Sequence, residues 1–547
     1  MSDTNSNMGA IAHCDVLVVG AGLSGISTLY RLRKLGLNVK VFESGGDFGG
    51  VWYWNSPVST HIRRYPGARV DSEWPYYQLN IPEVYRDYDF KERFPGHVEI
   101  RSYFAHLDKV LDLRKDVQFN AHVIDARWAA DDGWTVKTDQ GQVAKAKYLI
   151  LCTGLLHRRH VPDFPGLDTF KGVVHHTGYW PEDIDVSGKK VGIIGAGATA
   201  VQVTQELGKQ AKELTVFMRR PSYCLPMEQR ELSNAEQKGW KTFFDTLFRE
   251  GRKSGAGFPA KRQSLGVLDV PPEEREAWFE NIWQRGAFSY QLLNYADVLL
   301  NKESNKIVYD FWARKVGARI KNERKRELMA PKKQPYFFGT KRCPLEQDYY
   351  EVIDQDNVDI VDLNEQPLKT FNETGMLVGD KQIDLDIVVL ATGFDSFSGS
   401  LTQMGLKNRE GKDIAEVWKD GIRTYLGMTF HGFPNTFMVY SPHAPTALSN
   451  GPTIIEAQCD WVVSAIEKLE KEKAKTMEPK RDAEDSWDAM IDAMNKPTLF
   501  PLTNSWWNRA TIPGQKVQIL THPGGIEMYE GQIKEKLEGW QGFEVSY

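Results

Sequence analysis

The sequence predicts an α/β protein with two Rossmann-like domains, the second inserted in the first, together with a helical subdomain. Three observations lead to this prediction. A strand that runs into a glycine-rich turn and a helix occurs twice, at Gly20 and at Gly195. Two continuously apolar segments, 148–154 and 386–393, end in Thr-Gly, which is typical of buried parallel strands facing a ligand crevice. The long segment 222–330 has helical periodicity instead.

Composition and charge exclude several classes of protein. The chain has 547 residues, of which 41% are hydrophobic and 12% aromatic, and this is enough for several folded domains. A formal net charge of −5 favours a small-molecule partner over nucleic acid, and no apolar segment is long enough to insert into a membrane. The 5 cysteines form no CxxC pair and the polar start does not match a secretion signal, so we expect a cytoplasmic protein.

The first glycine turn follows the apolar segment 15–19. Gly20 permits the tight turn, Gly22 lets backbone N–H groups approach a pyrophosphate, and Gly25 lets the helix pack closely on the strand. Glu43 ends the next strand, where an acid accepts hydrogen bonds from ribose hydroxyls. Because strand, turn, helix and acid are all in place, this unit is predicted to bind a dinucleotide, FAD or NAD.

The second glycine turn repeats the unit, with Gly195, Gly197, Thr199 and Ala200 as its predicted nucleotide contacts. Its next strand ends in Arg219 and a second arginine, where the first unit has a glutamate. Guanidinium groups hold a ribose 2′-phosphate that an acid would repel, so this unit is predicted to bind NADP. Surface arginines that merely follow a strand are the alternative. Two dinucleotides in one chain imply electron transfer between them.

The two Thr-Gly strands are predicted to be the points where the chain leaves and re-enters the first nucleotide domain. The predicted domains are an FAD domain of 1–150 and 387–547, an NADP domain of 151–222 and 334–386, and a helical subdomain of 223–333. In the helical subdomain, Ser233 and Glu236 form a capping box, and Trp240, Phe243 and Phe244 follow at helical spacing. These aromatic faces are predicted to be core, or in part the wall of a substrate pocket.

The segment just before the second turn, 170–181, matches FxGxxxHxxxWP. This pattern resembles the fingerprint of Baeyer-Villiger monooxygenases, flavoenzymes that insert an oxygen atom beside a ketone carbonyl. The related heteroatom-oxidising flavin monooxygenases usually have tyrosine where this chain has Trp180. His176 is expected to hold the linker between the nucleotide domains by hydrogen bonds, without a role in proton transfer.

The resemblance covers nearly the whole chain. It continues in five further segments: 49–55, 64–71, 338–342, 423–427 and 505–506. One departure is an apparent insertion of eight residues at 56–63, between Trp52 and Tyr65, which would change the loop over the flavin.

The resemblance implies an FAD-containing, NADPH- and O2-dependent monooxygenase that converts ketones to esters or lactones through a flavin peroxide. It also implies that Arg342 is the active-site arginine and that Asp71 holds it. The residue types suit the reaction, because a guanidinium stays charged at any working pH and can stabilise the negative charge of the tetrahedral adduct. Lysine would suit it less, because burial can remove its proton.

The nucleotide contacts implied by the resemblance are Lys341 and Arg219 for the NADP 2′-phosphate, Trp506 as a lid near the nicotinamide, and Glu43, Trp52 and Tyr77 for FAD. Trp507 could take the place of Trp506. No metal is expected. The two histidines of 156–160 have two arginines between them, and prolines follow.

Other functions stay open at this stage. A heteroatom monooxygenase that oxidises amines or sulfides shares every nucleotide motif. An NADPH dehydrogenase or disulfide reductase is a second alternative, although the missing CxxC argues against the reductase, and a redox sensor without catalytic activity is a third. The sequence leaves linear, cyclic and aryl ketones as equal candidates for the substrate, and it does not indicate an oligomeric state.

Overall fold

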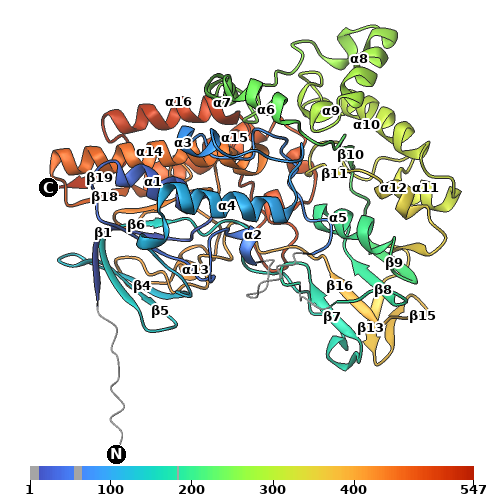
Figure 1. Cartoon of the computed structure of the whole chain (residues 1–547), viewed down its shortest axis with the longest axis horizontal. Coiled ribbons are helices and arrows are strands. Elements are labelled where there is room, and N and C mark those ends of the chain that lie inside the picture. Colours follow the sequence, from blue (N-terminus) through green and yellow to red (C-terminus); the bar gives the residue numbers. More distant parts are fainter. Residues whose placement is uncertain (1–10, 55–64, 181–183) are drawn as a thin grey trace, which may run out of the picture.

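The computed structural model describes residues 11–54, 65–180 and 184–547 (Figure 1). The apparent insertion at 56–63 and the proline that ends the fingerprint, Pro181, lie outside these residues. The described chain forms a mixed α/β fold around two separate sheets, one with a parallel centre and an antiparallel extension and one entirely parallel. Figure 1 shows the two sheets next to each other, with most of the helices above them.

The first sheet has seven strands, and six of them have the order β3-β2-β1-β6-β5-β4. The seventh, β17, pairs with the C-terminal end of β6, on the side of β6 that faces away from β1. In its parallel part, β1 lies between β2 and β6. Strand β5 then pairs antiparallel with β6, and β4 pairs antiparallel with β5. The strands are β1 (Ala12–Val19), β2 (Val39–Phe42), β3 (Val117–Gln118), β4 (Val123–Ala129), β5 (Gly133–Thr138), β6 (Val143–Leu151) and β17 (Thr436–Met438). The apolar segments of β1 and β6 are fully buried, as continuous apolar runs in a parallel sheet should be.

The second sheet is entirely parallel, in the order β12-β9-β8-β16-β7. Its strands are β7 (Val173–His176), β8 (Lys190–Ile194), β9 (Glu213–Met218), β12 (Val358–Asp362) and β16 (Ile387–Leu390). The prediction that the first domain resumes at 387 is wrong for β16, because this strand pairs with β8 and β7. The two Thr-Gly strands are equivalent elements of different sheets: β6 lies beside β1, and β16 lies beside β8.

Both glycine turns lead into the predicted helices. Gly20 has a φ of +107° and Gly195 a φ of +126°. A Cβ on Gly20 would lie 2.4 Å from the carbonyl oxygen of Cys152, and a Cβ on Gly195 would lie 2.4 Å from that of Ala391. Glycine is therefore required at both positions by the backbone conformation and by the neighbouring strand. The helices are α1 (Leu23–Arg33) and α5 (Ala198–Leu207).

The segment between β9 and β11 (Leu345–Glu346) is mostly helical, and it extends from the upper middle to the upper right of Figure 1. Its helices are α6 (Asn234–Lys241), α7 (Phe244–Arg252), α8 (Pro272–Gln284), α9 (Ser289–Leu292), α10 (Lys302–Gly317) and α11 (Glu323–Met329). The oxygen of Ser233 caps α6 by accepting the N–H of Glu236, as predicted. Phe244 is buried, but Trp240 and Phe243 are exposed, contrary to the predicted aromatic face. The helix ends between them, so the spacing does not continue across one face.

The C-terminal part returns to the first sheet. Helix α14 (Gly451–Glu472) packs along α1, and Arg31 of α1 donates a hydrogen bond of 2.7 Å to Asp460 of α14. The remaining helices are α2 (Val51–Trp54), α3 (Pro82–Tyr85), α4 (His97–Leu111), α12 (Tyr349–Ile353), α13 (Ile414–Val417), α15 (Arg481–Asn495) and α16 (Gly525–Glu538). The smaller strands are β10 (Leu225–Pro226), β11 (Leu345–Glu346), β13 (Leu368–Asn372), β14 (Gly375–Val378), β15 (Lys381–Asp384), β18 (Thr476–Pro479) and β19 (Phe543–Ser546). Among the described residues, none of the helices combines the length and the apolar composition needed to cross a membrane.

Candidate active site

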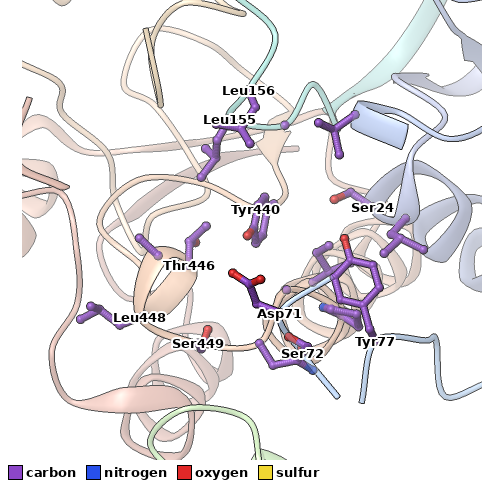
Figure 2. Close-up of a pocket in the computed structure, with 18 of the residues that line it drawn as sticks. Ser24, Asp71, Ser72, Tyr77, Leu155, Leu156, Tyr440, Thr446, Leu448 and Ser449 are labelled. Carbon is purple, nitrogen blue, oxygen red and sulfur yellow. The ribbon is translucent and has the colours of Figure 1, made fainter. Parts of the chain in front are cut away.

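A cavity of about 1220 Å³ opens where β1 and β6 end. Its wall combines the first glycine turn, the start of α5, part of the helical segment and several C-terminal loops. Predicted site residues that line it are Gly20, Gly22, Glu43, Trp52, Asp71, Tyr77, Thr199, Arg342 and Trp506. Figure 2 shows Asp71, Tyr77 and Tyr440 around this space; the first two come from the segment before α3, and Tyr440 follows β17. The cavity thus brings together residues from both ends of the chain.

The first glycine turn is closed by Glu43, which is almost completely buried. Its carboxylate accepts hydrogen bonds from the backbone N–H groups of Ala21, at 2.6 Å, and Gly45, at 2.7 Å. Burial raises the pKa of Glu43, while these two N–H groups act in the opposite direction. Gly25 does not line the cavity, because it packs against the carbonyl of Gly20. The carboxylate therefore shapes the turn and also borders the cavity.

Trp52 and Tyr77 form a second wall. The indole N–H of Trp52 donates to the hydroxyl of Tyr77 at 2.9 Å, and the two rings meet edge to face at 5.8 Å. Trp52 lies on the short helix α2, directly after the loop that closes over the first turn. The contact fixes both rings at the cavity wall.

Arg342 and Asp71 are 271 residues apart in sequence and form an ion pair with an N–O distance of 2.5 Å. The Asp71 side chain is only 3% exposed, whereas the Arg342 side chain is 46% exposed and lines the cavity. The carboxylate raises the pKa of Arg342, and burial raises the pKa of Asp71 against the effect of the guanidinium. The second oxygen of Asp71, Oδ1, has no hydrogen-bond partner among the described residues. Asp71 therefore fixes a guanidinium whose remaining N–H groups face the cavity.

The second glycine turn contributes less to this cavity. Thr199 lines it, but Gly195, Gly197 and Ala200 do not. Ala200 is buried, as expected for the position where the helix packs on its strand. A Cβ on Gly197 would meet no atom of the described residues within 4 Å, so the described part of the chain leaves the space in front of this turn open.

The predicted 2′-phosphate residues gather beside the second turn, outside the main cavity. Lys341 lies with its Nζ 4.5 Å from the centre of the Tyr336 ring. Burial, assisted by the nearby Arg220 and Arg219, lowers the pKa of Lys341 to about 8. No acidic side chain among the described residues forms an ion pair with these three cations. The group is therefore an uncompensated positive site, which suits a phosphate.

Both tryptophans near the C-terminus line the cavity. The ring of Trp506 stacks on Phe397 at 5.9 Å, and Trp507 is the more buried of the two and meets Phe500 edge to face. The more exposed Trp506 fits the expected position of a lid, and Trp507 fits a core position.

The sequence did not predict several residues of the cavity wall, among them Tyr440, Gln202 and Arg262. Tyr440 follows the buried strand β17, and its φ of +65° turns its side chain away from the strand direction. Burial raises the pKa of Tyr440 to about 12, so its phenol stays protonated beside Arg342. Only a positive φ distinguishes this residue from a strand tyrosine, and no sequence motif indicates that.

Gln202 of α5 connects the two parts of the molecule. Its Oε1 accepts a hydrogen bond of 2.9 Å from the hydroxyl of Tyr65, and its Nε2 donates to the carbonyl of Arg69 at 3.0 Å. The loop that carries Asp71 is therefore tied to the helix of the second glycine turn.

His176 ends β7 and is buried. Its Nδ1 accepts the N–H of Gly178 at 2.9 Å, so Nε2 carries the proton and donates to the carbonyl of Gly393 at 3.1 Å. Burial lowers the pKa of His176 to about 4, so the ring is neutral near pH 7. Among the residues that the structure describes, no three His, Cys, Asp or Glu side chains gather as metal ligands would.

Comparisons with known proteins agree with this arrangement. Residues 13–235 match the family model described as flavin-binding monooxygenase-like. The chain is 42% identical to the FAD-binding monooxygenase acrE of Aspergillus aculeatus, covering 97% of this chain and 89% of the relative. It is 38% identical to cyclopentanone 1,2-monooxygenase of Comamonas sp., covering 97% and 96%.

Solved structures give the same result. Cyclohexanone monooxygenase from Rhodococcus sp. Phi1, bound to NADP⁺, superposes with a TM-score of 0.92 at 31% identity, covering 98% of this chain and 100% of that structure. Relatives and structures thus match over almost the full length. The chain belongs to the Baeyer-Villiger monooxygenase family.

Proposed function

We propose that the protein is an FAD-containing, NADPH- and O2-dependent Baeyer-Villiger monooxygenase that converts ketones to esters or lactones. The observation that carries the proposal is the position of Arg342, whose guanidinium faces the cavity while the buried Asp71 holds it. Relatives named cyclopentanone 1,2-monooxygenase and acetone monooxygenase support ketones as the substrate class.

We assign FAD to the first sheet and NADP to the second. As predicted, the second Rossmann domain is then inserted in the first. Its C-terminal boundary moves past β16 (Ile387–Leu390), because this strand pairs with β8 of the second sheet. The helical segment between them forms part of the cavity wall and is assigned to the substrate.

The residues present fit both cofactors. Oδ1 of Asp71 has no partner among the described residues, so a bound group could donate a hydrogen bond to it. The open space in front of Gly197 would let a bound group approach the backbone of the turn. For FAD, the residues that would hold it are Gly20, Gly22, Gly25, Glu43, Trp52 and Tyr77. For NADP they are Gly195, Gly197, Thr199, Ala200, Arg219, Lys341 and Trp506. When bound and reduced by NADPH, FAD supplies the activation of O2 that no protein side chain provides.

The chain's own residues supply charge and position. In the reaction a ketone, O2, NADPH and a proton give an ester or lactone, NADP⁺ and water. The fixed N–H donors of Arg342 would stabilise the negative charge that develops on the carbonyl oxygen of the ketone during the reaction. Asp71 restricts the guanidinium to one orientation, so little reorganisation is needed when the charge develops. The protonated phenol of Tyr440 adds a second donor to the same region of the cavity.

The test is a panel of linear, cyclic and aryl ketones with NADPH under ¹⁸O2, analysed by mass spectrometry. We expect ester or lactone products that contain one ¹⁸O atom, with one NADPH consumed for each. Amines and sulfides in parallel assays serve as the comparison. Oxygenated amines or sulfides without any ester would replace the proposal by heteroatom oxidation, and NADPH consumption without an oxygenated product would leave it without support.

A further inference from the structure

The helical segment contributes an unusual cation to the cavity. Arg262 lies on the loop between α7 (Phe244–Arg252) and α8 (Pro272–Gln284) and lines the cavity together with Phe258, Phe288 and Leu292. These neighbours are apolar. A guanidinium in such a wall is expensive to bury unless a negative group accompanies it.

No such group is found in the described chain. Arg262 makes no hydrogen bond or ion pair with any described residue, and burial alone lowers its pKa, with no carboxylate near enough to oppose the effect. Among the other cations of the cavity wall, Lys261 also forms no ion pair with a described residue, but it is exposed. Arg342 is paired with Asp71, and Lys253 lies 3.1 Å from Glu250. Arg262 is therefore a charged donor whose partner is missing.

Arg262 lies on a different part of the chain from the residues assigned to the cofactor phosphates. Arg262 belongs to neither glycine turn, and the cations assigned to the 2′-phosphate, Arg219 and Lys341, do not line this cavity. The Arg262 guanidinium shares its wall with apolar side chains, which suits a substrate with an apolar body and a charged end. Arginine recognises such an end through paired N–H donors.

We propose that Arg262 binds an anionic group of the ketone substrate, so that the enzyme prefers oxo acids or phosphorylated ketones to neutral ketones. This specificity rests on the proposed ketone oxidation. The anion stays unreacted, while the carbonyl lies within reach of Arg342. Arg262 thus acts as a specificity-determining residue and takes no part in the oxygen transfer.

The experiment compares oxo acids with their neutral methyl esters. The probes are 2-oxocyclopentaneacetic acid and linear oxo acids from 4-oxopentanoic to 9-oxodecanoic acid, each with its methyl ester, and one ω-oxoalkyl phosphate. For at least one acid we expect kcat/KM to exceed that of its ester by about 10-fold or more. The Arg262→Met variant should lose about 10- to 100-fold in kcat/KM for this acid, mainly through KM, and keep its rate with the ester.

Two further variants are controls. Arg262→Lys should recover part of the preference, because it restores the charge without the paired donors. Lys253→Met removes the same charge from the same cavity at a position already paired with Glu250, and it should keep the preference for the acid. The KM for NADPH should be equal in all three variants. Loss of the preference in Lys253→Met but not in Arg262→Met would overturn the proposal.

A second readout is independent of turnover. The acid should raise the melting temperature of the FAD-loaded wild type without NADPH, and it should not raise that of Arg262→Met. The variant alone should be as stable as the wild type, since it loses an unpaired charge that is only partly exposed. Equal thermal shifts in both proteins would refute the anion site even if ketones are oxidised. Stabilisation confined to the wild type would support the site even if no ester forms, and would place the failure in the proposed reaction. A response to the phosphate alone would identify that class of substrate.

Discussion

In the ion pair of Arg342 and Asp71, the aspartate holds the guanidinium in place and the arginine faces the cavity. Asp71 is buried and hydrogen-bonds the guanidinium through Oδ2, whereas Arg342 keeps almost half of its side-chain surface on the cavity. A cation fixed in this way keeps its orientation when the negative charge of an adduct develops, and preorganised donors of this kind are the largest single contribution to many enzymatic rate enhancements.

Replacing Arg342 by alanine should therefore remove ester formation while leaving the flavin bound. Loss of one such donor typically costs about 3 to 4 kcal/mol, or about 100- to 1000-fold in rate. The measurement is kcat for the best ketone, with flavin content determined from the absorption spectrum. Arg342→Lys is the matched control and should retain more activity than the alanine variant. Ketone oxidation at the wild-type rate in Arg342→Ala would contradict the assignment.

Because of Lys341, the KM for NADPH should depend on pH, whereas the KM for NADH should not. With a pKa of about 8, its ammonium is charged at pH 7 and loses its proton as the pH rises. The KM for NADPH should rise above pH 8, because the neutral amine no longer attracts the 2′-phosphate, and the KM for NADH should stay flat. Lys341→Arg should remove the rise. Parallel changes for both coenzymes would exclude Lys341 from the phosphate site, and the same comparison at constant pH tests Arg219→Ala.

The sequence identifies these charged residues only through the resemblance to a family. Arg342 and Asp71 are 271 residues apart, and no periodicity brings them together. Tyr440 and Arg262 belong to segments that would otherwise be assigned as an apolar strand end and a surface loop. What makes them part of the site is a positive φ in one case and the absence of a neighbouring carboxylate in the other, and both depend on the three-dimensional structure.

Elements were predicted best where local physics decides. Both strand–turn–helix units form as expected because glycine alone satisfies the backbone at their first position. The partner of β16 was predicted wrongly, because an apolar composition shows that a strand is buried without showing in which sheet. The predicted aromatic face of Trp240 and Phe243 was also wrong, because their spacing does not show that the helix ends between them.

The two glycine turns allow a matched comparison of substitutions to alanine. In Gly20→Ala the new Cβ would lie 2.4 Å from the carbonyl oxygen of Cys152 at a φ of +107°, so we expect loss of FAD and of stability. In Gly197→Ala the Cβ would have no atom of the described residues within 4 Å, and the fold should keep its melting temperature. The added methyl group occupies the space in front of the turn, so the KM for NADPH should rise. An unchanged KM in this variant would show that the pyrophosphate lies elsewhere.

At the scale of the whole molecule, the two sheets are joined by two connecting segments that run next to each other. One follows β6 and the other follows β16, and an antiparallel bridge joins Arg159 to Phe394. The N–H of His160 donates to the carbonyl of Gly393 at 2.9 Å, and the same carbonyl accepts a hydrogen bond from Nε2 of His176. These hydrogen bonds connect the two sheets, together with the contact of Tyr65 on Gln202 and a hydrophobic core that includes residues of both sheets.

The neutral state of His176 makes this junction sensitive to acid. Its pKa is about 4 in the folded protein, below the value of about 6.5 for an exposed histidine, so the unfolded chain binds more protons between these values. The free energy of unfolding should consequently fall as the pH drops from 6.5 to 4, by up to about 3 kcal/mol from this residue. Asparagine at position 176 can still donate to Gly393 but does not titrate, so His176→Asn should be less stable at pH 7 and decline less steeply in acid. Melting temperatures of the two proteins from pH 7 to pH 4 provide the measurement, and equally steep declines would mean that the acid sensitivity arises away from the junction.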